Sequence, residues 1–182
     1  WAWGWAVGGL LVGSFLNVVI HRWPLMLEAE HPGERRFDLA YPPSHCPHCQ
    51  TPLHFVQLIP LLSFLWLRGR CGHCQHAIHW RYPVVEGLTM AWWLWCGLML
   101  PTPASLMTMP STTWWLTGTL GWGAPLSWAL WGSTLLALAW IDWDSTWLPD
   151  GLTQPLAWGG LVAAALGWSG LPLTQALMGA VL

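Results

Sequence analysis

Apolar residues along the chain form long runs that are separated by short polar connections. Residues 1–20 contain no charged side chain, and a helix of this length can cross a hydrocarbon layer roughly 30 Å thick. Three later runs of similar character predict further spanning helices over 83–100, 123–141 and 152–168. A short connection follows, and 173–182 predicts the beginning of a fifth. The pattern therefore predicts an all-α polytopic membrane protein with four full transmembrane helices plus the start of a fifth.

The composition supports a membrane location. Hydrophobic residues make up 54% of the 182 positions and charged residues only 8%, whereas a soluble domain carries roughly a quarter charged residues. The chain also has 19 tryptophans. Tryptophan is favoured at membrane–water interfaces because its ring is apolar while its N–H needs a partner. A general compositional bias toward tryptophan at lipid-facing positions explains any single one equally well.

The basic residues are confined to one stretch. All six Arg lie between Arg22 and Arg81, there is no Lys, and all eight His lie between His21 and His79. Because basic segments stay on the cytoplasmic side, we expect residues 21–82 to form a cytoplasmic insert. Alternation of the helices then places the Pro-rich 101–122 loop outside and the 142–151 connection in the cytoplasm. Every Asp and Glu is therefore expected on the cytoplasmic side.

Three parts follow from this pattern: a first transmembrane helix (1–20), the insert (21–82) and a membrane domain (83–182). The first helix lacks the basic start and the small-residue cleavage site of a secretory signal peptide. A net charge of −2 offers no basis for nucleic-acid binding. From the apolar pattern and the charge, the expected partner is the lipid bilayer.

Two Cys-x-x-Cys pairs lie in the insert, Cys46–Cys49 and Cys71–Cys74, separated by twenty-one residues. Their surroundings repeat, since His-Cys-Gln and the Leu/Ile-His that follows recur after twenty-five residues. Two similar knuckles that offer four thiolates suit a tetrahedral zinc ion. Four Cys ligands leave no open position for water, so we expect a structural role for the metal.

Other interpretations of the cysteines remain open at this point. Disulfides would pair the same residues, although a reducing cytoplasm disfavours them. Unligated buried thiols are the remaining alternative. The histidines are expected mainly on the surface, and Cys96, in the middle of an apolar run, is expected to be a small apolar filler.

Three carboxylates, Asp142, Asp144 and Asp150, lie within nine residues where an apolar run ends. Ionisable groups at the edge of a membrane span are costly and often functional. Asp150 follows a proline and is expected mainly to cap or lead into the next helix. Asp144 is expected mainly as a solvated turn residue.

Asp142 directly continues the apolar run, so we expect it to be partly desolvated, with a raised pKa. Asp142 and Asp144 point in different directions on a helix, so they do not make an acid–base pair. A catalytic partner for Asp142 would have to come from elsewhere.

Taken together, these motifs resemble the type IV prepilin leader peptidase and N-methyltransferase family, aspartic peptidase family A24. The resemblance rests on five segments in the family's order and spacing, which cover most of the chain from Gly13 to about Gly160: Gly13–Pro24, Leu58–Leu65, Leu67–Cys71, Arg81–Glu86 and Ile141–Thr153.

The resemblance implies a multifunctional enzyme of the bacterial inner membrane that serves type IV pilus and type II secretion systems. Such enzymes cleave the leader of type IV prepilins and pseudopilins. They then methylate the new N-terminal amine with S-adenosyl-L-methionine. The first family aspartate lies seven residues before the proline of the Leu-Pro block, which implies Asp142.

The family's second aspartate lies in a later Gly-x-Gly-Asp motif, which these 182 residues do not contain. We therefore expect the chain, as given, to stop before that residue and not to cleave prepilin alone. No glycine-rich loop of the Rossmann type is present. Glu86 is a candidate for binding the cofactor or the substrate amine, with a favourable place near a helix N-terminus as the alternative. A non-catalytic zinc-ribbon membrane scaffold, or a degenerate peptidase relative, remains the alternative function.

Overall fold

A computed structural model describes residues 2–28, 38–99, 123–169 and 171–181. Within these ranges the chain is helical, with two isolated β-bridges and no strand. The elements are α1 (Ala2–Glu28), the 3-10 helix η1 (Phe55–Leu58), α2 (Leu62–Trp66), α3 (Arg81–Met99), α6 (Gly123–Ser145), α7 (Asp150–Ala165) and α8 (Leu173–Val181). The expected all-helical class is confirmed for this part of the chain. The predicted 101–122 loop lies outside it.

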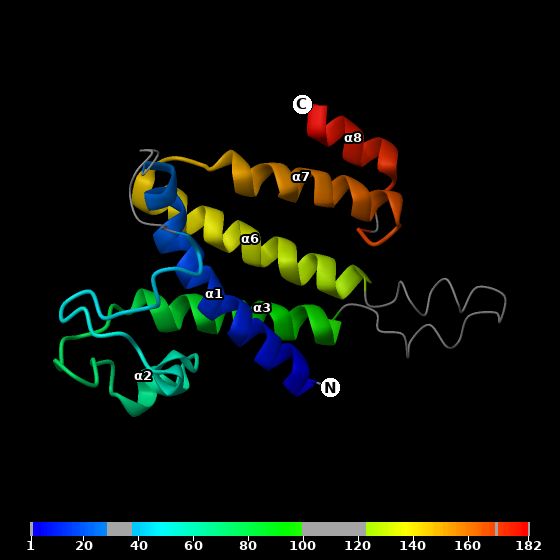
Figure 1. Cartoon of the computed structure of the whole chain (residues 1–182). Coiled ribbons are helices and arrows are strands. Elements are labelled where there is room, and N and C mark those ends of the chain that lie inside the picture. Colours follow the sequence, from blue (N-terminus) through cyan, green and yellow to red (C-terminus); the bar gives the residue numbers. More distant parts are fainter. Residues whose placement is uncertain (1, 29–37, 100–122, 170, 182) are drawn as a thin grey trace.

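The long helices form an up-and-down bundle (Figure 1). Helix α1 runs antiparallel to α3, because Trp5 at the start of α1 contacts Gly97 near the end of α3 while Asn17 bonds to Tyr82 near its beginning. Helices α3 and α6 are antiparallel as well, and so are α6 and α7. The insert that contains η1 and α2 lies at one end of the bundle, and the α6–α7 connection lies at the same end.

Glycines bring α1 and α3 into close contact. A Cβ atom on Gly9 would lie 2.8 Å from Met90 Cα, and one on Gly13 would lie 2.8 Å from Glu86 Cα. Neither contact can be relieved by moving a side chain. The Gly9-x-x-x-Gly13 spacing puts both glycines on one face of α1, which is a common way for helices to pack in membranes.

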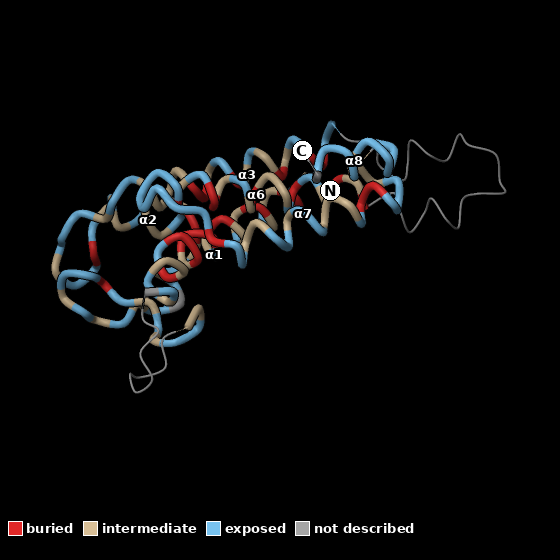
Figure 2. The backbone as a smooth tube through the Cα atoms, turned by 90° about the horizontal axis from the view of Figure 1, so that it is seen from above, coloured by how far each residue is buried: buried red, intermediate tan, exposed pale blue. Residues whose placement is uncertain are grey.

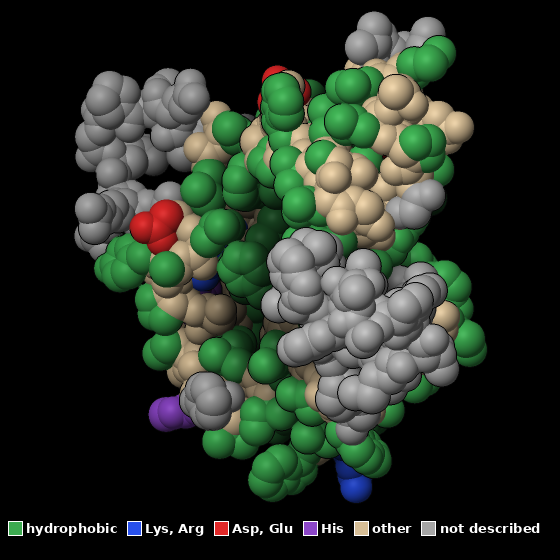
Figure 3. All heavy atoms as spheres, turned by 90° about the vertical axis from the view of Figure 1, so that its right-hand side faces the viewer, with side chains coloured by type: hydrophobic (Ala, Val, Ile, Leu, Met, Phe, Trp, Pro, Cys, Tyr) green, Lys and Arg blue, Asp and Glu red, His purple; other side chains and the backbone are tan. Residues whose placement is uncertain are grey.

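The burial pattern resembles that of a protein surrounded by lipid. Buried residues lie where α1, α3 and α6 contact one another (Figure 2). One cluster is formed by Leu16, Ile20, Val85, Ala137 and Ile141. Many large apolar side chains point outward instead, as on the end that faces the viewer in Figure 3, where hydrophobic side chains predominate among those described. Large exposed apolar surfaces mark contact with lipid or another protein.

A buried polar contact links α3 to α6. The indole N–H of Trp93 donates to the Ser133 hydroxyl over 2.9 Å, and that hydroxyl donates to the Ala129 carbonyl. Both side chains are almost fully buried. The pair satisfies a tryptophan N–H in an apolar contact, where a missing partner is costly.

Two described helices, α1 over Ala2–Leu27 and α6, are long and apolar enough to cross a membrane. Helix α3 has sufficient length, but Glu86 and three tryptophans make it less apolar. Helix α7 has 16 residues, or about 24 Å at 1.5 Å per residue, which is shorter than a typical hydrocarbon layer. The fold thus supports two of the four predicted spans by length and composition.

Helix α1 also differs from its predicted boundary. The apolar run ends at Ile20, but the helix continues through Arg22 and Pro24 to Glu28. The end of the apolar run therefore does not mark the end of the helix.

Candidate functional site

Arg22 attaches the insert to α1. Its guanidinium is buried and donates hydrogen bonds to the backbone carbonyls of Asp38, Leu39 and Pro42, at 3.0, 3.4 and 2.6 Å. The Asp38 carboxylate accepts bonds from the next turn of backbone, at Ala40 and Tyr41. Sequence reasoning counted Arg22 only as a topological charge. Its position directly after an apolar run was the available signal for this structural role.

The two Cys-x-x-Cys knuckles have the same backbone structure. In the first, Gln50 N–H donates to Cys46 C=O at 2.8 Å, and in the second, Gln75 N–H donates to Cys71 C=O at 3.0 Å. Both glutamines have a positive φ, 55° and 59°. Each knuckle is closed by one isolated β-bridge, His45 to Pro52 and Arg70 to Ala77. The twenty-five-residue repeat that the sequence shows is therefore also a structural repeat.

The four knuckle cysteines meet in one cluster. The sulfur atoms of Cys46, Cys49, Cys71 and Cys74 all lie within 4.8 Å of one another, and the Cys46 and Cys74 sulfurs are 3.8 Å apart. Four thiolates around zinc, each at about 2.3 Å, would form a tetrahedron with edges of about 3.8 Å. All four are free cysteines, so the disulfide interpretation does not describe this structure. The cluster fits a tetrahedral metal ion.

The ionisation of these thiols is uneven. Hydrogen bonds from the Thr51 side chain and backbone lower the pKa of Cys49 to about 6. For Cys74, the backbone bond from His76 lowers the pKa, but burial and the neighbouring sulfurs outweigh it and raise it to about 11. Four thiolates this close repel one another, so full ionisation requires a cation at the centre. A divalent metal supplies that charge.

Two described histidines, His48 and His76, lie beside this cluster and are not part of it. His48 of the first knuckle stacks on His76 of the second, with ring centroids 4.5 Å apart. Both rings are exposed, as expected for surface residues. Cys96 is fully buried among Trp5, Trp93 and Ala129, which confirms its expected role as a small apolar filler.

The acidic segment forms the end of α6 and the start of α7. Asp142 lies in the last turn of α6 and its side chain is exposed. The expectation that Asp142 is partly desolvated is therefore wrong for the described chain. The helix ends three residues later, and the residue that precedes Asp142, Ile141, is fully buried. The change from buried to exposed takes place within one residue, because successive helix positions point in different directions.

Asp144 and Asp150 have different surroundings. Asp144 forms an ion pair with Arg81 at the start of α3, so it is not simply a solvated turn residue. The N-cap of α7 is Pro149, and Asp150 is the first helical residue, with no capping bond from its side chain. Asp150 therefore leads into the helix, where a negative charge is favourable, but it is not the cap.

Glu86 has a contact that the sequence did not indicate. Its side chain is largely buried on α3, and its carboxylate accepts a hydrogen bond from the Leu61 N–H at 2.8 Å. Nearby, the buried Asn17 side chain donates to the Tyr82 carbonyl at 3.1 Å. Together these contacts connect α1, α3 and the insert. Glu86 thus has a structural contact in addition to any role in binding a cofactor or substrate.

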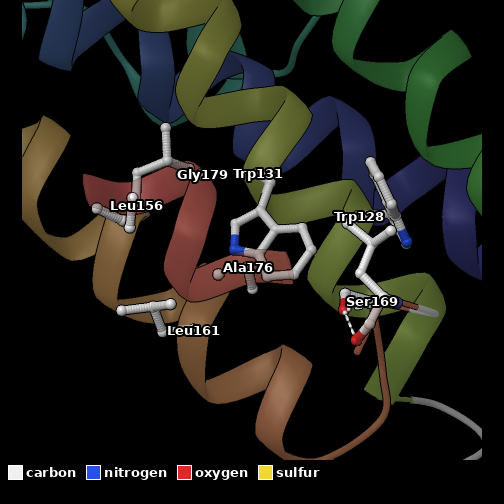
Figure 4. A pocket seen from close by; sticks show the side chains of 11 residues that line it. Trp128, Trp131, Leu156, Leu161, Ser169, Ala176 and Gly179 are labelled. Carbon is white, nitrogen blue, oxygen red and sulfur yellow. Dashed lines mark hydrogen bonds between the residues drawn. The ribbon is translucent and has the colours of Figure 1, made fainter. Parts of the chain in front are cut away.

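One hollow in the described part of the chain lies away from the acidic segment (Figure 4). It has a volume of about 340 Å³ and lies between α6, α7 and α8. Trp128, Trp131 and Leu156 contribute to its mainly apolar lining, which contains no Asp, Glu, His or Cys. Such a lining offers no acid–base or metal chemistry. The candidate site is therefore the other end of the bundle, where the insert and Asp142 lie (Figure 1).

A helical bundle with an apolar outer surface, carrying a tetracysteine insert and an acidic segment at one end, defines a class of membrane-associated protein. Comparison with known proteins specifies it further. The bacterial peptidase A24 N-terminal domain matches residues 7–100, and the type IV leader peptidase family matches residues 129–182. The chain belongs to the type IV leader peptidase family, as the motifs predicted.

Curated relatives support the assignment. The chain is 42% identical to a type 4 prepilin-like proteins leader peptide-processing enzyme of Escherichia coli, over 95% of this chain and 60% of that protein. It is 42% identical to a prepilin leader peptidase/N-methyltransferase of Aeromonas salmonicida, over 94% of this chain and 57% of that protein. A Neisseria gonorrhoeae protein of the same name is 38% identical, over 97% of this chain and 59% of that protein. The chain thus spans less than two thirds of these relatives. No solved structure matches it.

Proposed function

We propose that this chain supplies the Asp142-bearing part of a prepilin leader peptidase and N-methyltransferase. The relatives carry that name. The observation that supports the proposal is that two neighbouring carboxylates have different surroundings. Asp144 is paired with Arg81, whereas Asp142, two residues earlier, is exposed and has no ion pair among the described residues. Asp142 is therefore the carboxylate of this pair that is open to substrate and to a second acid.

The chemistry requires two carboxylates. One must be ionised to take a proton from the attacking water, and the other must be protonated to polarise the scissile carbonyl. Two carboxyl groups close together share a proton and titrate as a coupled pair. We propose that Asp142 is one member and that the other is the aspartate of a Gly-x-Gly-Asp motif, as the family resemblance implies. Substrates would be type IV prepilins and pseudopilins.

We also propose the membrane arrangement. Helices α1, α3, α6 and α7 would span the bacterial inner membrane, with the insert of residues 21–82 and the 142–151 connection in the cytoplasm. The antiparallel order of the helices supports this, because it brings both segments to one end. The described arginines, Arg22, Arg68, Arg70 and Arg81, belong to the insert and its junctions with α1 and α3, which supports the orientation. Exposed Trp158 and Val162 on α7 are consistent with lipid contact despite its short length.

The described residues offer a site for zinc but no recognisable loop for S-adenosyl-L-methionine. We propose that Cys46, Cys49, Cys71 and Cys74 hold a zinc ion, which would cross-link the two knuckles and leave no open coordination position. For S-adenosyl-L-methionine, the described residues form no sheet and so provide no Rossmann-type loop. Glu86 remains the candidate on this chain for binding that cofactor or the substrate amine.

Leader cleavage by the full-length protein tests the proposal. Asp142→Asn is expected to abolish cleavage of a prepilin, because a carboxamide can neither take a proton nor give one. Asp150→Asn removes the same charge eight residues away and is expected to lower the rate only a few fold. Circular dichroism and zinc content show whether both variants fold. Normal cleavage by folded Asp142→Asn would reject the proposal and favour a non-catalytic scaffold.

A further inference from the structure

The segment that joins the two knuckles exposes an unusual amount of apolar surface. Its exposed side chains, which we call the 56–66 patch, are Val56, Leu58, Leu62, Leu65 and Trp66. Leu65 is 69% exposed and Trp66 is 79% exposed. Helix α2 has no buried residue. A water-soluble metal-binding loop of this size would not ordinarily leave so many large apolar groups uncovered.

The position of α2 along the bundle indicates what covers this patch. Leu61, the residue before α2, donates its N–H to the Glu86 carboxylate at 2.8 Å. Glu86 lies five residues after the start of α3 at Arg81, which is about 8 Å along the helix axis. Helix α2 therefore begins beside the second turn of α3 and not beyond the end of the bundle. It lies at the level where a spanning helix enters the membrane.

Exposed tryptophans mark the same level. Trp80 directly precedes α3, and Trp143 and Trp147 lie where α6 ends; all three side chains are exposed. Tryptophan collects at the boundary between headgroups and acyl chains. Trp66 of α2 adds a fourth at this end of the molecule. The aromatic residues thus indicate a single interface that includes the insert.

Charge complementarity identifies the kind of surface. Arg68 and Arg70 follow α2 directly, and both are exposed. No Asp or Glu lies between Asp38 and Glu86 in the sequence. Apolar groups beside exposed cations are the combination that binds an anionic membrane surface. A cationic leader, which prepilins carry as the resemblance implies, would be repelled by the same arginines.

We propose that the 56–66 patch lies in the headgroup and upper acyl layer of an anionic bilayer. The 56–66 patch of the insert is then embedded in the membrane surface, while the cysteine knuckles stay in water. The insert is held at three places: by Arg22 on the 38–42 backbone, by Glu86 on Leu61, and by lipid on α2. The inference rests on the proposed membrane arrangement. It adds a lipid-binding role for a segment that was expected to be wholly cytoplasmic.

Depth-dependent fluorescence quenching tests this in the full-length protein. A fluorescent amino acid replaces Leu65 in one variant and Gln50, exposed in the first knuckle, in a matched control. Each protein is reconstituted into vesicles of phosphatidylcholine and phosphatidylglycerol that contain lipids brominated near the headgroup end of the acyl chain. Strong quenching at position 65, several times that at position 50, is expected. Equal quenching at the two positions would overturn the proposal.

Two further measurements separate lipid from other occupants. Omitting phosphatidylglycerol, or making the Arg68→Gln/Arg70→Gln variant, is expected to reduce quenching at position 65 and leave position 50 unchanged. Quenching at 65 that disappears when the protein concentration rises, or when prepilin is added, would mean that a second copy or the substrate covers the patch, and would also overturn the proposal.

Leader cleavage is measured in the same vesicles. Quenching without cleavage would reject the proposed function and support the lipid contact. Cleavage without quenching would support the proposed function and reject the lipid contact.

Discussion

The guanidinium of Arg81, in the first turn of α3, forms an ion pair with the carboxylate of Asp144, in the last turn of α6. Arg81 lies at the C-terminal end of the insert (21–82), and Asp144 lies two residues after Asp142. The ion pair therefore connects the cysteine-containing insert to the segment that carries the candidate catalytic group. The two residues are 63 positions apart in the sequence.

We expect the Arg81–Asp144 pair to contribute modestly to stability. The Arg81 side chain is 17% exposed and the Asp144 side chain 45%, so water screens the attraction. A double-mutant cycle with Arg81→Gln and Asp144→Asn is expected to give a coupling energy of about 0.2–1 kcal/mol, measured by chemical unfolding in detergent.

The same variants separate structure from catalysis. Both single variants are expected to slow leader cleavage by a similar, few-fold factor, and the exchange Arg81→Asp/Asp144→Arg is expected to recover part of the rate. If Asp144→Asn abolished cleavage while Arg81→Gln had little effect, Asp144 would act in the chemistry itself.

Loss of one knuckle cysteine is expected to release the metal. Cys71→Ser should reduce bound zinc to a small fraction of the wild-type content, because three thiolates and a poor hydroxyl ligand bind zinc far more weakly. Metal analysis of purified full-length protein measures this. Limited proteolysis should then show new cleavage within residues 38–80 while the long helices stay protected.

Cys96→Ala is the matched control for the metal site. Cys96 is buried among apolar residues, and its replacement should leave the zinc content unchanged. Retention of wild-type zinc by Cys71→Ser would show that the four cysteines are not the ligand set.

The close approach of α1 to α3 predicts an effect of very small substitutions. Gly13→Ala would place a methyl group 2.8 Å from Glu86 Cα, so the helices must move apart. We expect a loss of about 1–3 kcal/mol of stability, seen as a lower unfolding temperature by circular dichroism in detergent. Gly87→Ala on α3 meets nothing within 4 Å. Because alanine has a better helix propensity than glycine, Gly87→Ala should leave the stability unchanged or raise it by up to about 1 kcal/mol.

Removal of the buried Ser133 hydroxyl is expected to lower the stability of the fold by more than the size of the group suggests. Ser133→Ala leaves the Trp93 indole N–H without its partner in a buried contact, which should cost about 1–3 kcal/mol. Thr134→Ala, next to it on α6, removes an exposed hydroxyl that bonds only to its own helix. Equal unfolding temperatures for the two variants would argue against an important role for the Trp93 bond.

The helices and the metal cluster were predictable because their signals are local. An apolar run long enough to span a membrane predicts a helix wherever it occurs, and the bounds of α3, α6, α7 and α8 agree with those runs to within a few residues. The repeated Cys-x-x-Cys pattern predicts one site, because two similar turns that offer four thiolates have few other uses. The exposure of Asp142 was not predictable in this way. It depends on which side of α6 faces α3.

By itself the sequence determined the all-helical class, the family, the cysteine set and the carboxylate segment. All of these follow from residue type and spacing along the chain. Tertiary structure alone decided that Arg81 pairs with Asp144, that Glu86 holds the insert beside the second turn of α3, and that α2 turns its apolar side chains outward. These contacts join residues 25 to 63 positions apart. Their formation depends on how the helices pack against one another and against the insert, which residue spacing along the chain does not specify.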